Sequence, residues 1–70
     1  MKKSTRIKQL QRHARAQERT IAHYQEMVGK ARADPEYYGS NLQEFERNLR
    51  HTEKYLDGVN AEIDELMATE

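Results

Sequence analysis

Histidines and acidic residues are the side chains of this sequence with the greatest capacity for chemistry. There are three histidines and twelve Asp or Glu residues in a chain of 70. His23 and Glu26 form one His-x-x-Glu spacing, but the His-x-x-x-His and Glu-x-x-His spacings that place two metal ligands on one helix face do not occur. A composite site that uses His23 and His51 would need further ligands. We therefore expect no metal site.

The other routes to catalysis also lack the residues they need. Neither Ser4 nor Ser40 has a histidine close by in the sequence, and the chain has no cysteine. The three glycines are isolated from one another, so they form no phosphate-binding loop. We expect no catalytic residue, no cofactor and no enzymatic activity.

Two apolar series predict the elements that carry these side chains. In each half of the chain, residues recur at alternating spacings of three and four, as they do along the seam of a coiled-coil-like helix pair. The first series is Ile7, Leu10, Ala14, Gln17, Ile21, Tyr24, Val28 and Ala31, and the second is Leu42, Phe45, Leu49, Thr52, Leu56, Val59, Ile63 and Leu66. We expect an all-α chain with helices over about residues 4–33 and 41–67.

The segment between the two series has the residues of a hinge. Asp34 followed by Pro35 is typical of a helix N-cap with proline at the first helical position. Inside one continuous helix Pro35 would cost about 3 kcal/mol or more. Gly39 provides a residue that can end a short turn. We therefore predict a hinge over residues 34–40, with a helical turn at 35–38.

The start of the second helix and the direction of the chain follow from the same segment. Ser40 and Gln43 have the spacing of a capping box, so we expect their side chains to bond to the first backbone N–H groups of the helix. A short connection between two helices of similar length favours an antiparallel hairpin, which pairs Leu10 with Ile63. The whole chain, residues 1–70, is predicted to be a single helical-hairpin domain.

Charge is divided between the two ends of the chain. Residues 1–20 carry seven Lys or Arg and one Glu, whereas residues 55–70 carry five Asp or Glu and no Lys or Arg. These segments lie side by side in an antiparallel hairpin, and the formal net charge is zero, so we expect them to neutralise each other. The expected ion pairs join Lys8, Arg12 and Arg15 to Asp57, Glu62, Asp64 and Glu65.

Nucleic-acid binding is the alternative interpretation of the basic segment, because clustered Lys and Arg bind phosphates. The residues that would make these contacts are Arg6, Lys8, Arg12, Arg15 and Arg19. Membrane binding is not expected, because the basic helix lacks a large apolar face. No apolar run approaches the roughly 20 residues that cross a bilayer.

One flank of the predicted hairpin is free of charge. With Ile7 and Leu42 at heptad position a, positions g and c of both helices form this flank. Its middle part, which we call the uncharged flank, consists of His13, Ala16, Thr20, His23, Met27, Asn48, His51, Tyr55 and Gly58. Depletion of charge together with Tyr and Met is typical of the centre of a protein interface. We expect the flank to pack against a second copy, as a four-helix homodimer, or against another protein.

The predicted interface residues are Thr20, His23, Met27, Asn48, His51 and Tyr55, together with Tyr37 and Tyr38 at the hinge. Two alternatives remain open. In the first, Met27 and Tyr55 only widen the core of the hairpin instead of forming an interface. In the second, the hinge tyrosines cap the end of the hairpin instead of contacting a partner. His23 and His51 lie at the same height, and histidine changes its charge near about pH 6.5, so we expect acid to loosen an interface here.

In layout the whole chain resembles the Rop family of plasmid copy-number regulators, small helical hairpins that dimerise into four-helix bundles and bind paired RNA loops. No residue-level motif accompanies the resemblance, so it implies no site. The chain also looks like small phage-borne or mobile-element proteins that bind and block a host machine. We predict a cytoplasmic, non-enzymatic regulator or inhibitor that binds itself and an unidentified protein. Rop-like RNA or DNA binding is the alternative, and a structural spacer in a larger assembly is a third.

Overall fold

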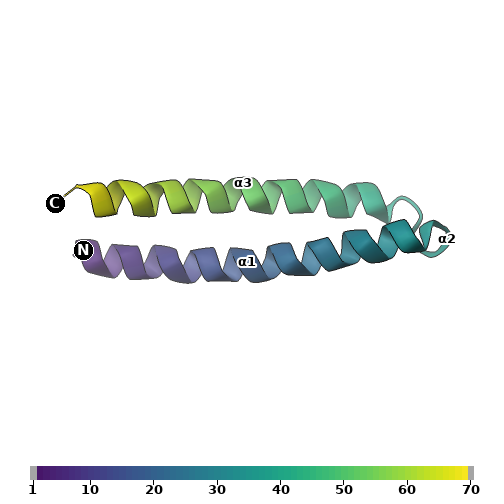
Figure 1. Ribbon diagram of the computed structural model, residues 1–70, viewed down its shortest axis with the longest axis horizontal. Coiled ribbons are helices and arrows are strands. Elements are labelled where there is room, and N and C mark those ends of the chain that lie inside the picture. Colours follow the sequence, from purple (N-terminus) through teal and green to yellow (C-terminus); the bar gives the residue numbers. More distant parts are fainter. Residues whose placement is uncertain (1, 70) are drawn as a thin grey trace.

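Two long antiparallel helices joined by one short helical turn make up the computed structural model, which describes residues 2–69 (Figure 1). Helix α1 spans Lys3–Ala33, α2 spans Pro35–Tyr38 and α3 spans Asn41–Ala68. The long helices begin and end within about one residue of the predicted positions, and both chain termini lie at the end opposite the hinge. Residues 1 and 70 of the predicted domain lie outside the described residues.

The hinge forms as the sequence predicts. Asp34 is the N-cap of α2, where its Oδ1 atom accepts a hydrogen bond from the backbone N–H of Tyr37 at 3.2 Å, and Pro35 follows at the first helical position. Gly39 ends the turn with φ 55° and ψ −126°, and its N–H donates to the carbonyl oxygen of Pro35 at 2.9 Å. Glycine suits this position because a side chain disfavours positive φ.

The predicted capping box at the start of α3 is wrong. Ser40 precedes α3 with φ −75° and ψ −6°, and its side chain makes no capping hydrogen bond. A capping side chain reaches the free N–H groups when its own backbone is extended, whereas the backbone of Ser40 is already in the helical region. The chain therefore enters α3 directly from the turn at Gly39.

The two seams face each other, and every seam residue is buried or half-buried. The buried residues are Leu10, Ala14, Val28, Ala31, Val59 and Ile63. Towards the open end, Leu56 and Leu66 pack against the cluster of Leu10, Ala14, Val59 and Ile63. Thr52, a polar member of the second seam, donates its hydroxyl to the carbonyl oxygen of Asn48 at 2.8 Å. This bond satisfies the hydroxyl within its own helix.

The core between the two helices is thin. Most of the large seam residues are only half-buried, among them Ile7, Ile21, Tyr24, Leu42, Phe45, Leu49, Leu56 and Leu66. The Cα atoms span 54 × 15 × 14 Å, so the hairpin has a large surface for its volume. Chains of this length commonly need a second layer or a partner to cover their apolar surface. Neither long helix has, within residues 2–69, a stretch apolar enough to span a bilayer.

Candidate functional site

The predicted interface residues of the two helices divide into an inner and an outer group. Thr20, Met27 and Asn48 are half-buried, whereas His23, His51 and Tyr55 are exposed. An ion pair between Arg6 and Glu62, both at position g, shows that the g positions of the two helices meet on one side of the seam. The half-buried residues, all at position g, therefore adjoin the seam. Of the exposed residues, His23 and His51 lie at the outer c positions, and Tyr55 lies at position g.

Tyr55 borders a hollow in the uncharged flank. The side chain of Tyr55 is 53% exposed, although it is large and mostly apolar. The hollow beside it is lined by Leu10, Lys54, Tyr55, Gly58, Val59 and Glu62. Gly58 contributes to this hollow because it has no side chain, and a Cβ atom placed on it would meet nothing within 4 Å. The flank therefore combines a projecting aromatic ring with an adjacent depression.

The two hinge tyrosines have different surroundings. The ring of Tyr38 packs edge-on against Phe45 of α3, with the ring centroids 6.2 Å apart, and Tyr38 is half-buried. Tyr37 stacks edge-on against Tyr38 at 4.9 Å but remains 78% exposed. Tyr38 thus caps the end of the hairpin, and Tyr37 is the hinge residue available to a partner.

The ion pairs predicted between the two ends of the chain do not form. Arg6 pairs with Glu62 at 2.8 Å, but Lys8, Arg12 and Arg15 make no ion pair with an acidic residue of α3 among the residues described. The reason is their heptad position. Arg6 and Glu62 at position g flank the seam, whereas Lys8 and Arg15 at b and Arg12 at f project away from it. The other pairs in residues 2–69 are Lys30 with Glu26 at 3.3 Å and Arg32 with Glu46 at 4.0 Å.

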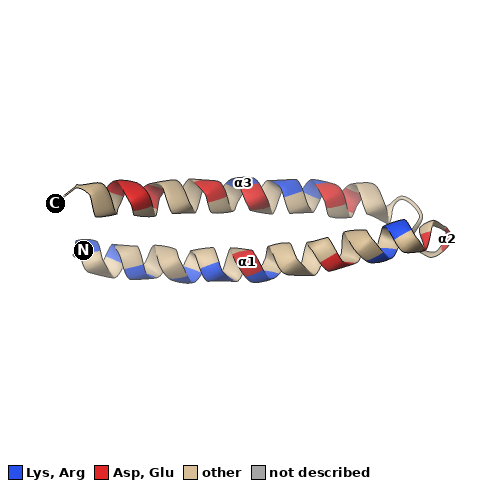
Figure 2. Ribbon diagram, in the orientation of Figure 1, with Lys and Arg blue, Asp and Glu red and all other residues tan. Residues whose placement is uncertain are grey.

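A basic ridge on α1 remains unneutralised as a result. We give this name to Lys8, Arg12, Arg15 and Arg19, whose spacings of four, three and four place them on one outward face of the helix. Figure 2 shows several blue Lys and Arg segments along this part of α1. Red Asp and Glu segments lie in both halves of α3, and the C-terminal half of α3 has no Lys or Arg. None of the four has an ion-pair partner in the described part of the chain.

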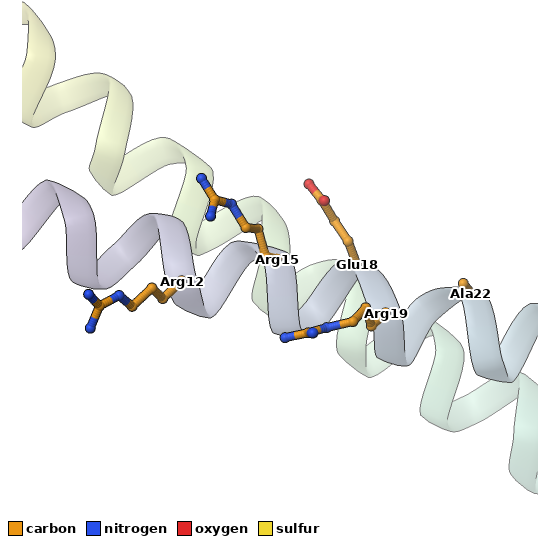
Figure 3. Close-up of a pocket in the computed structure, with 5 residues that line it drawn as sticks. All are labelled: Arg12, Arg15, Glu18, Arg19 and Ala22. Carbon is orange, nitrogen blue, oxygen red and sulfur yellow. The ribbon is translucent and has the colours of Figure 1, made fainter.

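The middle of the basic ridge contains a shallow hollow. It is lined by Arg12, Arg15, Glu18, Arg19 and Ala22, all from α1. Arg12 and Arg19 point along the helix in the same direction, and Arg15 and Glu18 project together on another side (Figure 3). Like charges three or four residues apart on a helix disfavour it slightly, by a few tenths of a kcal/mol for each pair. Such an arrangement is suited to a negatively charged ligand.

Sequence reasoning missed a second basic group, on α3. Arg47, Arg50, His51 and Lys54 line one hollow. The signal was present in the sequence, since Arg47, Arg50 and Lys54 follow one another at spacings of three and four. This group lies beside the uncharged flank, because His51 belongs to both.

All three histidines are exposed on the surface of the hairpin. His23 lies against the ring of its neighbour Tyr24, with the centroids 5.6 Å apart. Residues 2–69 contain no group of three or more His, Asp or Glu side chains that could hold a metal ion. The candidate surfaces among the described residues are the uncharged flank, the exposed ring of Tyr37 and the basic ridge.

Comparison with known proteins adds no functional information. No protein-family model matches the chain, and neither a curated protein nor a solved structure matches it.

Proposed function

We propose that this chain is a non-enzymatic, cytoplasmic protein-binding regulator or inhibitor. The uncharged flank would join two copies as a four-helix bundle, and the exposed ring of Tyr37 at the hinge would remain available to the partner protein. The observation that carries the proposal is the exposed state of His23, His51 and Tyr55 in a strip without any Asp, Glu, Lys or Arg. The centres of protein interfaces are depleted of charge and enriched in aromatic residues.

The thin core supports the same proposal. Half-buried seam residues such as Ile21 and Leu49 border the half-buried inner positions of the flank. A second helical layer on this side would remove more apolar surface from water, and each Å² removed contributes about 25 cal/mol. One face of a body 54 Å by 15 Å measures roughly 800 Å², which equals the area that each partner contributes to a standard interface. The whole face, with the uncharged flank at its centre, is therefore large enough for a standard interface.

Sedimentation equilibrium at micromolar concentrations tests the flank as an interface. We expect the wild-type chain to be a dimer and Tyr55→Glu to be a monomer, because the substitution buries a charge in the centre of the contact. Asn60→Glu is the matched control, since it also adds a negative charge to a neutral, exposed residue of α3 but lies at heptad position e, on the other side of the seam from the flank. It should remain a dimer.

Two results would contradict the proposal. A wild-type chain that stays monomeric and helical up to high micromolar concentration would rule out pairing of two copies. A dimer that Tyr55→Glu leaves intact would place the contact on another face. Circular dichroism of each variant separates a lost interface from a lost fold, because a monomer that keeps its helices has lost only the contact.

Binding of RNA or DNA is the second candidate function, and the unpaired basic ridge is the observation that favours it. Four phosphate contacts would make the logarithm of the affinity fall with the logarithm of salt concentration, with a slope of about −3 to −4. An oligonucleotide titration at several salt concentrations measures this slope. Arg12→Gln with Arg15→Gln should weaken binding strongly, whereas Arg32→Gln, at the far end of α1, should not. The absence of binding at low salt would exclude this function.

A further inference from the structure

We propose, on the basis of the proposed function, that the two copies pair with their hinges at the same end, so that α1 of each copy lies on α3 of its partner. Two flat hairpins related by a two-fold axis can stack in two ways. An axis parallel to the helices brings the hinges together and opposes unlike helices. An axis across the helices puts the hinges at opposite ends and opposes like helices. The outer rows of the flank distinguish these arrangements.

The outer rows are the c positions of the two helices, including those beyond the ends of the uncharged flank. On α1 the row is Gln9, Ala16, His23 and Lys30, and on α3 it is Glu44, His51, Gly58 and Glu65. Within one hairpin the g positions meet at the seam, as the contact between Arg6 and Glu62 shows, so the c rows lie at opposite edges. A residue of one c row therefore meets the other row only across a dimer.

The same-end arrangement brings opposite charges together. Rotation about an axis parallel to the helices keeps each residue at the same position along that axis. Residues of α1 and α3 that lie at the same height within one hairpin therefore also lie opposite each other between the two copies. Lys30 then faces the partner's Glu44, and Gln9 faces the partner's Glu65. Within residues 2–69 Glu44 and Glu65 make no ion pair in their own chain, and Lys30 pairs only with Glu26 of its own helix. Both acids are free to take a contact from a partner.

The opposite-end arrangement brings like charges together instead. When two hairpins overlap along their whole length, Glu44 faces the partner's Glu65 at both ends of the α3 pair, and Lys30 faces the uncharged Gln9. Like charges placed opposite each other across an interface disfavour that pairing. Charge complementarity of the c rows therefore favours the same-end arrangement.

The smallest residues of the two rows support this choice. In the same-end arrangement Ala16 faces the partner's Gly58, so the two helices can approach closely at that height. Gly58 is exposed in the middle of α3, where glycine disfavours a helix by about 1 kcal/mol relative to alanine. Nothing within its own chain requires glycine, because a Cβ there would meet no atom within 4 Å. In the same-end dimer, the absence of a side chain at Gly58 allows the partner's α1 to approach α3 closely.

Cysteine crosslinking distinguishes the two arrangements, because the described residues contain no cysteine and introduced thiols would act alone. The variant His23→Cys/His51→Cys places its thiols face to face only in the same-end dimer, and it leaves the close approach of Ala16 and Gly58 unchanged. The variant Ala16→Cys/His23→Cys does so only in the opposite-end dimer. We expect mild oxidation or a short bismaleimide to give covalent dimers from the first variant and monomers from the second. The reverse pattern would overturn the proposal, and so would failure of both variants to crosslink although both sediment as dimers.

A charge-exchange cycle supplies an independent test. Lys30→Glu and Glu44→Lys should each weaken the dimer by about tenfold, and the double variant should recover the wild-type affinity. In the opposite-end arrangement Glu44→Lys would instead strengthen the dimer, and the double variant would show no recovery. Helicity is followed in parallel, because Lys30→Glu also removes the pair with Glu26.

The two proposals fail in different ways. A wild-type chain that sediments as a monomer overturns the pairing of copies on the flank, which belongs to the proposed function. A wild-type dimer that Tyr55→Glu disrupts, but that crosslinks through Ala16→Cys/His23→Cys, leaves the proposed function standing. It overturns only the same-end arrangement.

Discussion

Arg6 and Glu62 join the two long helices near their open end, with Nη2 of the arginine 2.8 Å from Oε2 of the glutamate. Their side chains are 47% and 45% exposed, so water and salt screen the attraction. We expect Glu62→Gln to lower the free energy of unfolding by less than about 1 kcal/mol, and the difference to vanish at high salt. Urea unfolding at low and high salt measures it, with Glu65→Gln as the unpaired control. A larger loss that persists at high salt would contradict this prediction.

Gly39 is expected to tolerate no larger residue without loss of stability. Its φ of 55° with ψ of −126° is a conformation that residues with a side chain rarely adopt, so Gly39→Ala should lower the free energy of unfolding by about 1–3 kcal/mol. Thermal or urea unfolding measures the change. Ser40→Ala is the control, and it should change stability by less than about 0.5 kcal/mol because the hydroxyl makes no capping bond. If Ser40→Ala lowered the free energy of unfolding as much as Gly39→Ala, the result would indicate that the Ser40 hydroxyl does form a capping hydrogen bond.

Gly29 and Gly58 provide a matched pair of substitutions. Both lie in helix interiors with open space where a Cβ atom would be, but only Gly58 belongs to the uncharged flank. Alanine at either position should raise the stability of the helix by about 0.5–1 kcal/mol. We expect Gly29→Ala to leave the dimer unchanged and Gly58→Ala to weaken it, because a methyl group would separate the two copies. Equal dimer affinities for the two variants, measured by sedimentation, would remove Gly58 from the interface.

Acid is expected to weaken the dimer. His51 shares its hollow with Arg47, Arg50 and Lys54, and in the same-end dimer it faces the partner's His23, which lies against Tyr24. A positive charge on either imidazole would add to this basic region and repel the other across the contact, so the dissociation constant of the dimer should rise as the pH falls from about 8 to 5.5.

Sedimentation across this pH range measures the effect, and two variants locate it. His51→Gln should reduce the pH dependence, whereas His13→Gln should keep it, since His13 belongs to the flank but lies away from the paired histidines. A dimer affinity that stays constant between these pH values in the wild type would contradict the prediction.

The uncharged flank could be predicted because heptad positions follow from residue spacing alone. The ion pairs between the two helices could not be predicted in this way. Lys8 and Arg12 lie near acidic residues of α3 along the helix axis, but they project from outward positions, and only the lateral placement of the helices showed that Arg6 reaches Glu62. The hinge tyrosines differ in the same manner. Although they are adjacent in sequence, Tyr38 packs against Phe45 and caps the end of the hairpin, whereas Tyr37 remains exposed.

The sequence by itself determined the helices, their seam and the position of the hinge. These are local properties: the spacing of Leu10 and Ala14 sets a helix face, and Asp34 with Pro35 begins a new helix through short-range bonding and a restricted backbone. Tertiary structure alone decided which side chains pair, which ring caps the end and how much of the seam stays exposed. Those outcomes depend on the lateral distance and rotation between α1 and α3, and they arise only when the two helices are packed together.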